Sequence, residues 1–125
     1  MAYLRVDVQE INSRNVFTNA RAFDGMTMAF EGDGSDFGCE IPYGARDDKY
    51  LILIHNAGSE SANITVKGGN ALQGGKDLTF VLDEGKFTLL QPDSGRFKNV
   101  DGEYKGKVVV TAGSANVKVA VFRLP

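Results

Sequence analysis

The feature that most constrains the fold is a regular alternation between short apolar or β-branched segments and clusters of turn residues. Gly, Asn, Asp and Ser gather along the chain about every 8–12 residues, which is the spacing of strands in an all-β sandwich or barrel. Val, Ile and Thr are frequent between these clusters, and their branched side chains suit a pleated surface. The pattern predicts an all-β chain.

Two segments carry the clearest strand patterns. Residues 3–11 alternate, with Leu4, Val6 and Val8 facing one way and the polar side chains between them facing the other. Residues 50–55 form a continuous apolar run, which is expected of a central strand covered on both faces. Further strands are predicted at residues 62–67, 77–82, 86–90, 95–100, 107–112 and 116–124, with a short, weakly alternating one at 26–31.

Turn residues suggest how some of these strands connect. Residues 83–85 are predicted to make a tight hairpin turn, because Gly85 accepts a positive φ at little cost. Residues 112–115 are predicted to close a second hairpin, and the glycines of residues 68–75 indicate a long flexible loop. Residues 95–100 are read as a short strand or sheet edge after a turn at 92–95.

These patterns together predict a compact antiparallel β-sandwich of about nine strands with little or no helix. The 125 residues fit one domain, 1–125, and no linker divides them. Residues 12–48 are expected to be irregular and rich in loops, with at most one helical turn at 15–22. Pro42 within this region removes a donor that a sheet ladder would need.

Composition excludes several classes of function. One Cys excludes an internal disulfide, and one His excludes paired-His zinc ligation and makes any catalytic triad depend on His55. A net charge of −2 gives no basic excess for nucleic acid. His55 is better explained as a strand-end imidazole bonded to nearby backbone, and Cys39 as a passive, partly buried loop thiol. We therefore expect no enzyme and no catalytic, cofactor or metal site.

The irregular region offers two weaker candidates. Acidic side chains crowd residues 31–48, and their oxygens could hold calcium, although the spacing lacks the helix-loop-helix pattern. A solvated acidic loop is the preferred interpretation, and ion binding stays open. Aromatic side chains in the same region could form a partner surface or could pin loops to the sandwich. They are Phe17, Phe23, Phe30, Phe37 and Tyr43.

Several segments resemble small proteins encoded beside the major capsid gene in tailed phages and prophages. Residues 4–12 are similar to their opening strand, residues 50–58 and 63–67 to their central hairpin, and residues 83–86 and 95–97 to their glycine turn and following strand. The ending 117–125, with its Arg-Leu-Pro finish, and Asn56 after the central strand are the more specific parts. Residues 24–46 do not match.

The resemblance implies a virion structural protein, of the head decoration or cement type, that binds the outer capsid shell. Its partners would be the major capsid protein or other virion proteins, and it would form a homo-oligomer such as a trimer. An acidic surface suits the outside of a capsid better than its DNA-facing interior. Binding only the assembled shell stabilises that shell by mass action.

The candidate partner-binding residues are Ala2, Tyr3, Leu4, Arg5, Phe37 and Tyr43. The first four could add as a strand to an exposed edge of a capsid protein. The alternative is that Leu4 packs in the chain's own core, which its alternation with Val6 favours.

The start of the chain carries charge where a secretory apolar region would lie, and no segment reaches the roughly 20 apolar residues that span a bilayer. We therefore expect synthesis in the host cytoplasm, a place in the virion and no membrane partner. The alternative function is a carbohydrate- or ligand-binding β-sandwich module of a phage fibre, with Tyr43 or Phe37 at its site. The absence of Trp counts against it.

Overall fold

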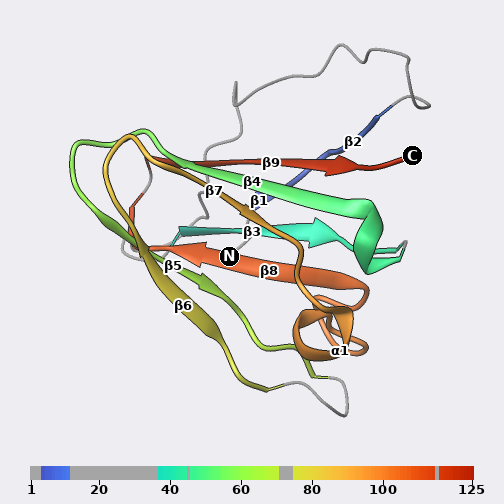
Figure 1. Cartoon of the computed structure of the whole chain (residues 1–125). Coiled ribbons are helices and arrows are strands. Elements are labelled where there is room, and N and C mark those ends of the chain that lie inside the picture. The colour runs from blue at the N-terminus through green and yellow to red at the C-terminus, as the bar shows by residue number, and fades with distance from the viewer. Residues whose placement is uncertain (1–3, 12–36, 45, 71–74, 115) are drawn as a thin grey trace.

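The computed structural model describes residues 4–11, 37–44, 46–70, 75–114 and 116–125 (Figure 1). The irregular stretch predicted at 15–22 and the strand predicted at 26–31 lie outside these residues, as do Ala2, Tyr3, Phe17, Phe23 and Phe30. The strands are β1 (Leu4–Arg5), β2 (Val8–Glu10), β3 (Phe37–Pro42), β4 (Tyr50–Asn56), β5 (Ala62–Val66), β6 (Leu78–Leu82), β7 (Phe87–Leu90), β8 (Lys107–Ala112) and β9 (Val117–Arg123).

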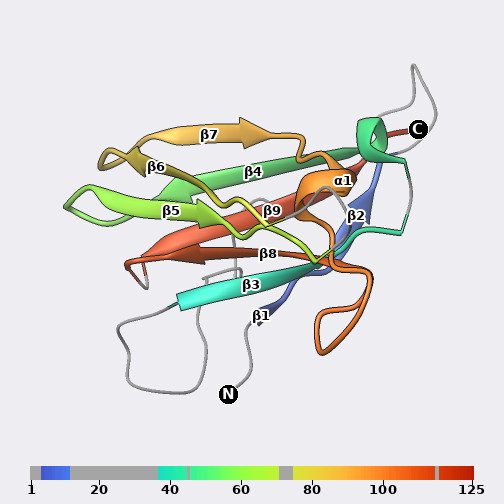
Figure 2. The same cartoon turned by 90° about the horizontal axis from the view of Figure 1, so that it is seen from below.

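These strands form two sheets, one in the order β1-β3-β8-β5-β6 and one in the order β2-β9-β4-β7. Figures 1 and 2 show the two sheets packed face to face, with β6 and β7 at their edges on one side. The predicted all-β sandwich is confirmed. Apart from the two-residue β1, each sheet contains four strands, and their order is that of a double-sheet jelly roll.

Consecutive strands mostly change sheets, which corrects the predicted hairpins. Among the described strands, β5 and β6 are the only consecutive pair that hydrogen-bond to each other. β6 and β7 lie in different sheets although residues 83–86 form a turn in which Lys86 N–H donates to Asp83, and Gly85 has a φ of +69°. β4 and β5, and β8 and β9, are likewise separated. The turn residues were read correctly, but they lead from one sheet to the other.

The single strand predicted at residues 3–11 is split into β1 and β2, which belong to different sheets. β1 pairs with β3 and β2 pairs with β9, both in parallel, so the sandwich is not wholly antiparallel as predicted. The predicted alternation persists across the crossing, since Val6 is buried while Arg5 and Asp7 are exposed. Strands that switch sheets in this way form the corners of a sandwich.

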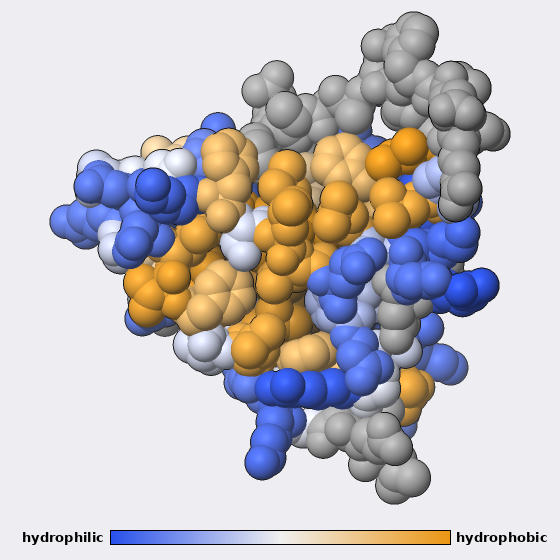
Figure 3. Space-filling model, in the orientation of Figure 1, coloured by the Kyte–Doolittle hydropathy of each residue, from blue (hydrophilic) through white to orange (hydrophobic). Residues whose placement is uncertain are grey.

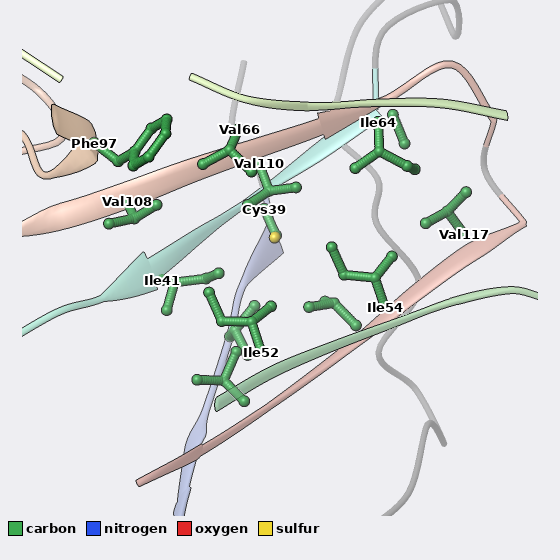
Figure 4. Packing of buried hydrophobic residues seen from close by; sticks show 14 of the residues in the cluster. Cys39, Ile41, Ile52, Ile54, Ile64, Val66, Phe97, Val108, Val110 and Val117 are labelled. Atoms are coloured by element: carbon green, nitrogen blue, oxygen red, sulfur yellow. The ribbon is translucent and has the colours of Figure 1, made fainter. Parts of the chain in front are cut away.

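The core lies between the sheets and is built from alternate residues of each strand. Ile52 and Ile54 of β4 point toward Ile41 of β3 and Val110 of β8 (Figure 4). Cys39 is fully buried in this cluster rather than partly buried in a loop. Burial, reinforced by the negative charge of Glu40, raises the pKa of the Cys39 thiol to about 12, so it stays protonated and inert.

Two local predictions were wrong. β3 occupies residues 37–42 within the region expected to be irregular, and Pro42 is tolerated because it is the last residue of that strand.

Residues 94–97 form a one-turn helix, α1 (Ser94–Phe97), where a strand or edge was expected. Asp93 caps α1 by accepting a hydrogen bond from Gly95 N–H at 2.8 Å, which satisfies a donor at the helix start. A 3-10 turn, η1 (Asp47–Lys49), precedes β4.

The loop predicted to be flexible at 68–75 is fastened at its start. Gly69 N–H donates to Arg96 O at 2.8 Å, and Asn70 bonds both to Asp101 O and to Val100 N–H. A Cβ at Gly69 would lie 2.3 Å from the carbonyl oxygen of Lys98, so only glycine fits this approach. Residues 71–74 lie outside the described part of the chain.

Candidate interaction surface

Arg5, one of the predicted N-terminal contact residues, belongs to a charged cluster on the outer side of the five-stranded sheet. Leu4 and Arg5 form β1, and Arg5 Nε donates to the Glu40 carboxylate at 2.9 Å. Lys107 Nζ contacts the same carboxylate at 2.7 Å. Leu4 pairs with Cys39 in the ladder, so its backbone belongs to this domain's own sheet.

This cluster determines the charge state of Glu40. Its side chain is only 11% exposed, and burial alone would raise the pKa of its carboxyl. The hydrogen bonds and charges of Lys107 and Arg5 outweigh that effect and hold the pKa below its usual value. Glu40 therefore stays ionised and joins β1, β3 and β8. Of the predicted acidic loop, Glu40 and Asp48 thus face cations, since Asp48 pairs with Arg46 at 2.7 Å.

The two aromatic candidates are structural. Tyr43 is fully buried, stacks on Tyr50 with ring centroids 4.3 Å apart, and donates its hydroxyl to the Pro92 carbonyl. A buried ring cannot contact a partner, so Tyr43 is removed from the candidate surface. Phe37 is half-buried and packs against the core cluster. Both side chains pin their segment to the sandwich, which was the alternative interpretation of these aromatics.

A surface that sequence reasoning missed lies on the outer face of the four-stranded sheet. In β4, residues alternate between buried and half-buried positions, so Leu51, Leu53 and His55 point away from the core. The ladder places Leu89 opposite Leu53, and Phe122 opposite Leu51. We call the outward apolar set the apolar face; its members are Leu51, Leu53, Phe87, Leu89 and Phe122.

The most open part of the apolar face is β7, the edge strand of its sheet. Phe87 is 56% exposed and Leu89 is 59% exposed. Figure 3 looks onto the edge of the sandwich formed by β6 and β7, and shows apolar surface at β7 that runs across to β6 of the other sheet. The outer face of an antiparallel sheet is normally polar because it meets water. Contiguous exposed apolar surface marks a site where another molecule binds.

His55 lies beside this surface. Its imidazole stacks on the Phe87 ring with centroids 4.2 Å apart and planes within 10°. The side chain is half-buried on the sheet, beside Lys118 of β9 in the ladder. Its imidazole therefore lies on the outer sheet face beside the apolar face, stacked on an exposed aromatic ring.

Within the described residues, no group of three or more His, Cys, Asp or Glu side chains is arranged to hold a metal ion. No helix of the described residues has the length and apolarity that crossing a membrane requires. Glu31, Asp33 and Asp36 of the predicted acidic loop lie outside those residues.

Comparison with known proteins returned no matching family, no matching curated protein and no matching solved structure.

Proposed function

We propose that this chain is a non-enzymatic structural protein of a phage or prophage virion, a capsid decoration protein that binds the outer shell through the apolar face. The observation that carries the proposal is the exposure of Phe87 and Leu89 on an outer sheet face where polar side chains are normal. The similarity of residues 4–12, 50–58 and 117–125 to proteins encoded beside capsid genes supports the identity of the partner.

Rigid strands suit this role. Phe87 and Leu89 are held by ladder pairing with His55 and Leu53, so little conformational entropy is lost when a partner covers them. A large aromatic ring beside an aliphatic side chain is the usual anchor of a protein interface. Because capsid subunits repeat, many copies of one weak contact together stabilise an assembled shell.

The carbohydrate-binding alternative has less support. A jelly-roll strand order occurs in both capsid and lectin domains, so the fold alone does not choose between them. The residues suggested for a sugar site were Tyr43 and Phe37, and the first is buried while the second packs against the core.

Co-sedimentation with purified capsids of the source phage tests the proposal. The native chain should pellet with mature shells, and Leu89→Asp should abolish pelleting because it puts a charge in the contact. Val100→Asp is the matched control, since Val100 is 53% exposed and lies outside both sheets. Absence of native binding, or equal binding by Leu89→Asp, would contradict the proposal.

A further inference from the structure

The outer edge of β6 presents backbone groups for another strand. Lys67 N–H donates to Val109 O, and Gly113 N–H donates to Asn63 O, so the odd-numbered residues of β5 direct their backbone groups to β8. The even-numbered residues of β5 therefore direct their backbone N–H and C=O groups to β6, where they pair with Leu78, Phe80 and Leu82. It follows that the N–H and C=O groups of Thr79 and Val81 point away from β5.

β6 carries none of the features by which natural edge strands avoid pairing. Its five residues include no charge, no proline and no glycine. Val81 is 61% exposed and Leu78 is 37% exposed. Among the described strands none lies beyond β6, which ends its sheet. A second strand added here would gain a full ladder and cover apolar side chains.

The charges at the two ends of β6 are unequal: basic side chains outnumber the acidic Asp77 at its start, and acidic side chains outnumber the basic Lys86 at its end. Near its start lie Lys67, Lys76 and Arg96; the Lys67 ammonium is 3.8 Å from the Asp77 carboxylate, and Arg96 donates to the Lys76 and Asp77 carbonyls. Near its end lie the acidic side chains of Asp83 and Glu84. The Asn56 side-chain amide donates to the carbonyls of Glu60 and Leu82, which brings Glu60 to the same end of the strand. An antiparallel neighbour with the same sequence would place each basic end against an acidic end.

We propose that two copies of this chain pair antiparallel through their β6 strands, forming a dimer with two-fold symmetry. Centring the axis on Phe80 places Thr79 opposite Val81 of the second copy, so the outward backbone groups of both residues are satisfied twice. The same register sets Lys76 against Glu84 of the second copy. It also sets Asp77 against Asp83, and Lys67 beside Asp77 offsets that repulsion. The two five-stranded sheets then continue as one.

Sedimentation measurements over a dilution series test the dimer. The native chain should show a monomer–dimer equilibrium, and Val81→Lys should weaken the dimer by about tenfold or more, because a two-fold interface carries each substitution twice. Val100→Lys, the control on an exposed valine outside the sheets, should leave the equilibrium unchanged. Monomers at every concentration, or equal effects of the two variants, would overturn the proposal.

A charge exchange tests the orientation. Lys76→Glu and Glu84→Lys should each weaken dimerisation, and the double variant should regain most of the native affinity because the pair is restored with its signs reversed. Double-variant binding no stronger than that of the single variants would contradict the antiparallel register. Thermal unfolding of each variant shows that the monomer is intact.

Disulfide trapping tests the register itself. Cys39 is buried and does not interfere. A mixture of Thr79→Cys and Val81→Cys chains should cross-link readily, because residues opposite each other in a hydrogen-bonded pair have Cα atoms about 5.5 Å apart. Either variant alone should cross-link poorly, since two like positions lie more than about 7 Å apart in this register. Preferential linking of either variant to itself would refute it.

The dimer and the capsid contact can fail separately. Leu89→Asp should abolish capsid binding and leave dimerisation intact, because Leu89 points from the outer face of the other sheet. A dimer that does not bind capsids contradicts only the proposed function, and a monomer that binds them contradicts only the β6 pairing.

Discussion

The outer faces of the two sheets are opposite in character. The five-stranded sheet carries mostly polar side chains on its outer side, which we call the polar face; it includes Glu40, Asn63, Thr65, Thr79 and Lys107, with Val81 and the buried Val109 among them. Its side chains are bonded to one another: Thr65 and Thr79 hydroxyls lie 3.2 Å apart, and Glu40 bridges two cations. The four-stranded sheet shows the apolar face.

This difference separates stability from binding. On the polar face, interactions within the chain join neighbouring strands, so the face contributes to folding. On the apolar face, Phe87 and Leu89 keep more than half of their surface in water, so they contribute little to the free energy of folding. Their surface is available to a second molecule. Substitutions on the two faces should therefore change different measurements.

The largest expected change in stability is on the polar face. Glu40→Gln should lower the free energy of unfolding by about 2 kcal/mol, because it leaves the mostly buried Lys107 ammonium without a counter-charge. Arg5→Gln should cost less than about 1 kcal/mol, since the Arg5 side chain is 71% exposed. Urea unfolding measures both. Equal losses of unfolding free energy in the two variants would show that burial of the Lys107–Glu40 pair is not the cause of the Glu40→Gln effect.

The same carboxylate predicts a pH dependence. The pKa of Glu40 is lower in the folded chain than its ordinary value of 4.5, so its contribution to stability is complete above pH 4.5 and is lost as the pH falls through the folded pKa. The difference in unfolding free energy between the native chain and Glu40→Gln should shrink over that range. A difference independent of pH would contradict the ionised state assigned to Glu40.

A smaller effect is expected where the apolar face has an internal contact. Phe87→Ala removes the ring that stacks on His55 and should lower the free energy of unfolding by about 1 kcal/mol. The Phe87→Leu variant keeps apolar area without the ring and separates stacking from burial. If Phe87→Ala costs as much as a core truncation, the ring belongs to the core and not to a binding surface.

The smallest stability effect should be at Leu89. Leu89→Asp should change the free energy of unfolding by less than about 0.5 kcal/mol, because the side chain is 59% exposed on an edge strand. The charge on an apolar edge strand should also raise the solubility limit. Large destabilisation by this variant would mean that the apolar face is needed for folding, which would remove the contrast between the two faces.

Much of the secondary structure follows from local sequence, because alternation and turn residues are local signals. The strands at β4, β5, β6, β7, β8 and β9 were predicted close to their observed bounds. The pairing of these strands was not predicted correctly, because a turn such as Asp83–Gly85 can connect two paired strands or two strands of different sheets. β3 was missed because Pro42 and the flanking glycines argued against a ladder. The structure forms the strand because it buries the apolar side chains of Cys39 and Ile41 between the sheets.

The apolar face was only partly predictable from the sequence, and its strand β4 was misinterpreted. The apolar run at 50–55 was taken as a strand covered on both faces, but only its Ile52 and Ile54 side is buried in the core. Leu51 and Leu53 become a surface only when β7 supplies Phe87 and Leu89 beside them. That pairing joins segments far apart in the chain, so no local pattern reveals it. α1 could have been found, because Asp93 is a preferred N-cap residue directly before Ser94.

Hydroxyl-radical footprinting with and without capsids of the source phage tests the central claim most directly, because it reports both faces in one molecule. Capsids should strongly protect Phe87 and Leu89 from labelling and leave Val100 and the polar-face residue Lys107 unchanged. Unaltered labelling of Phe87 and Leu89 on a capsid-bound chain, or protection confined to the polar face, would contradict it.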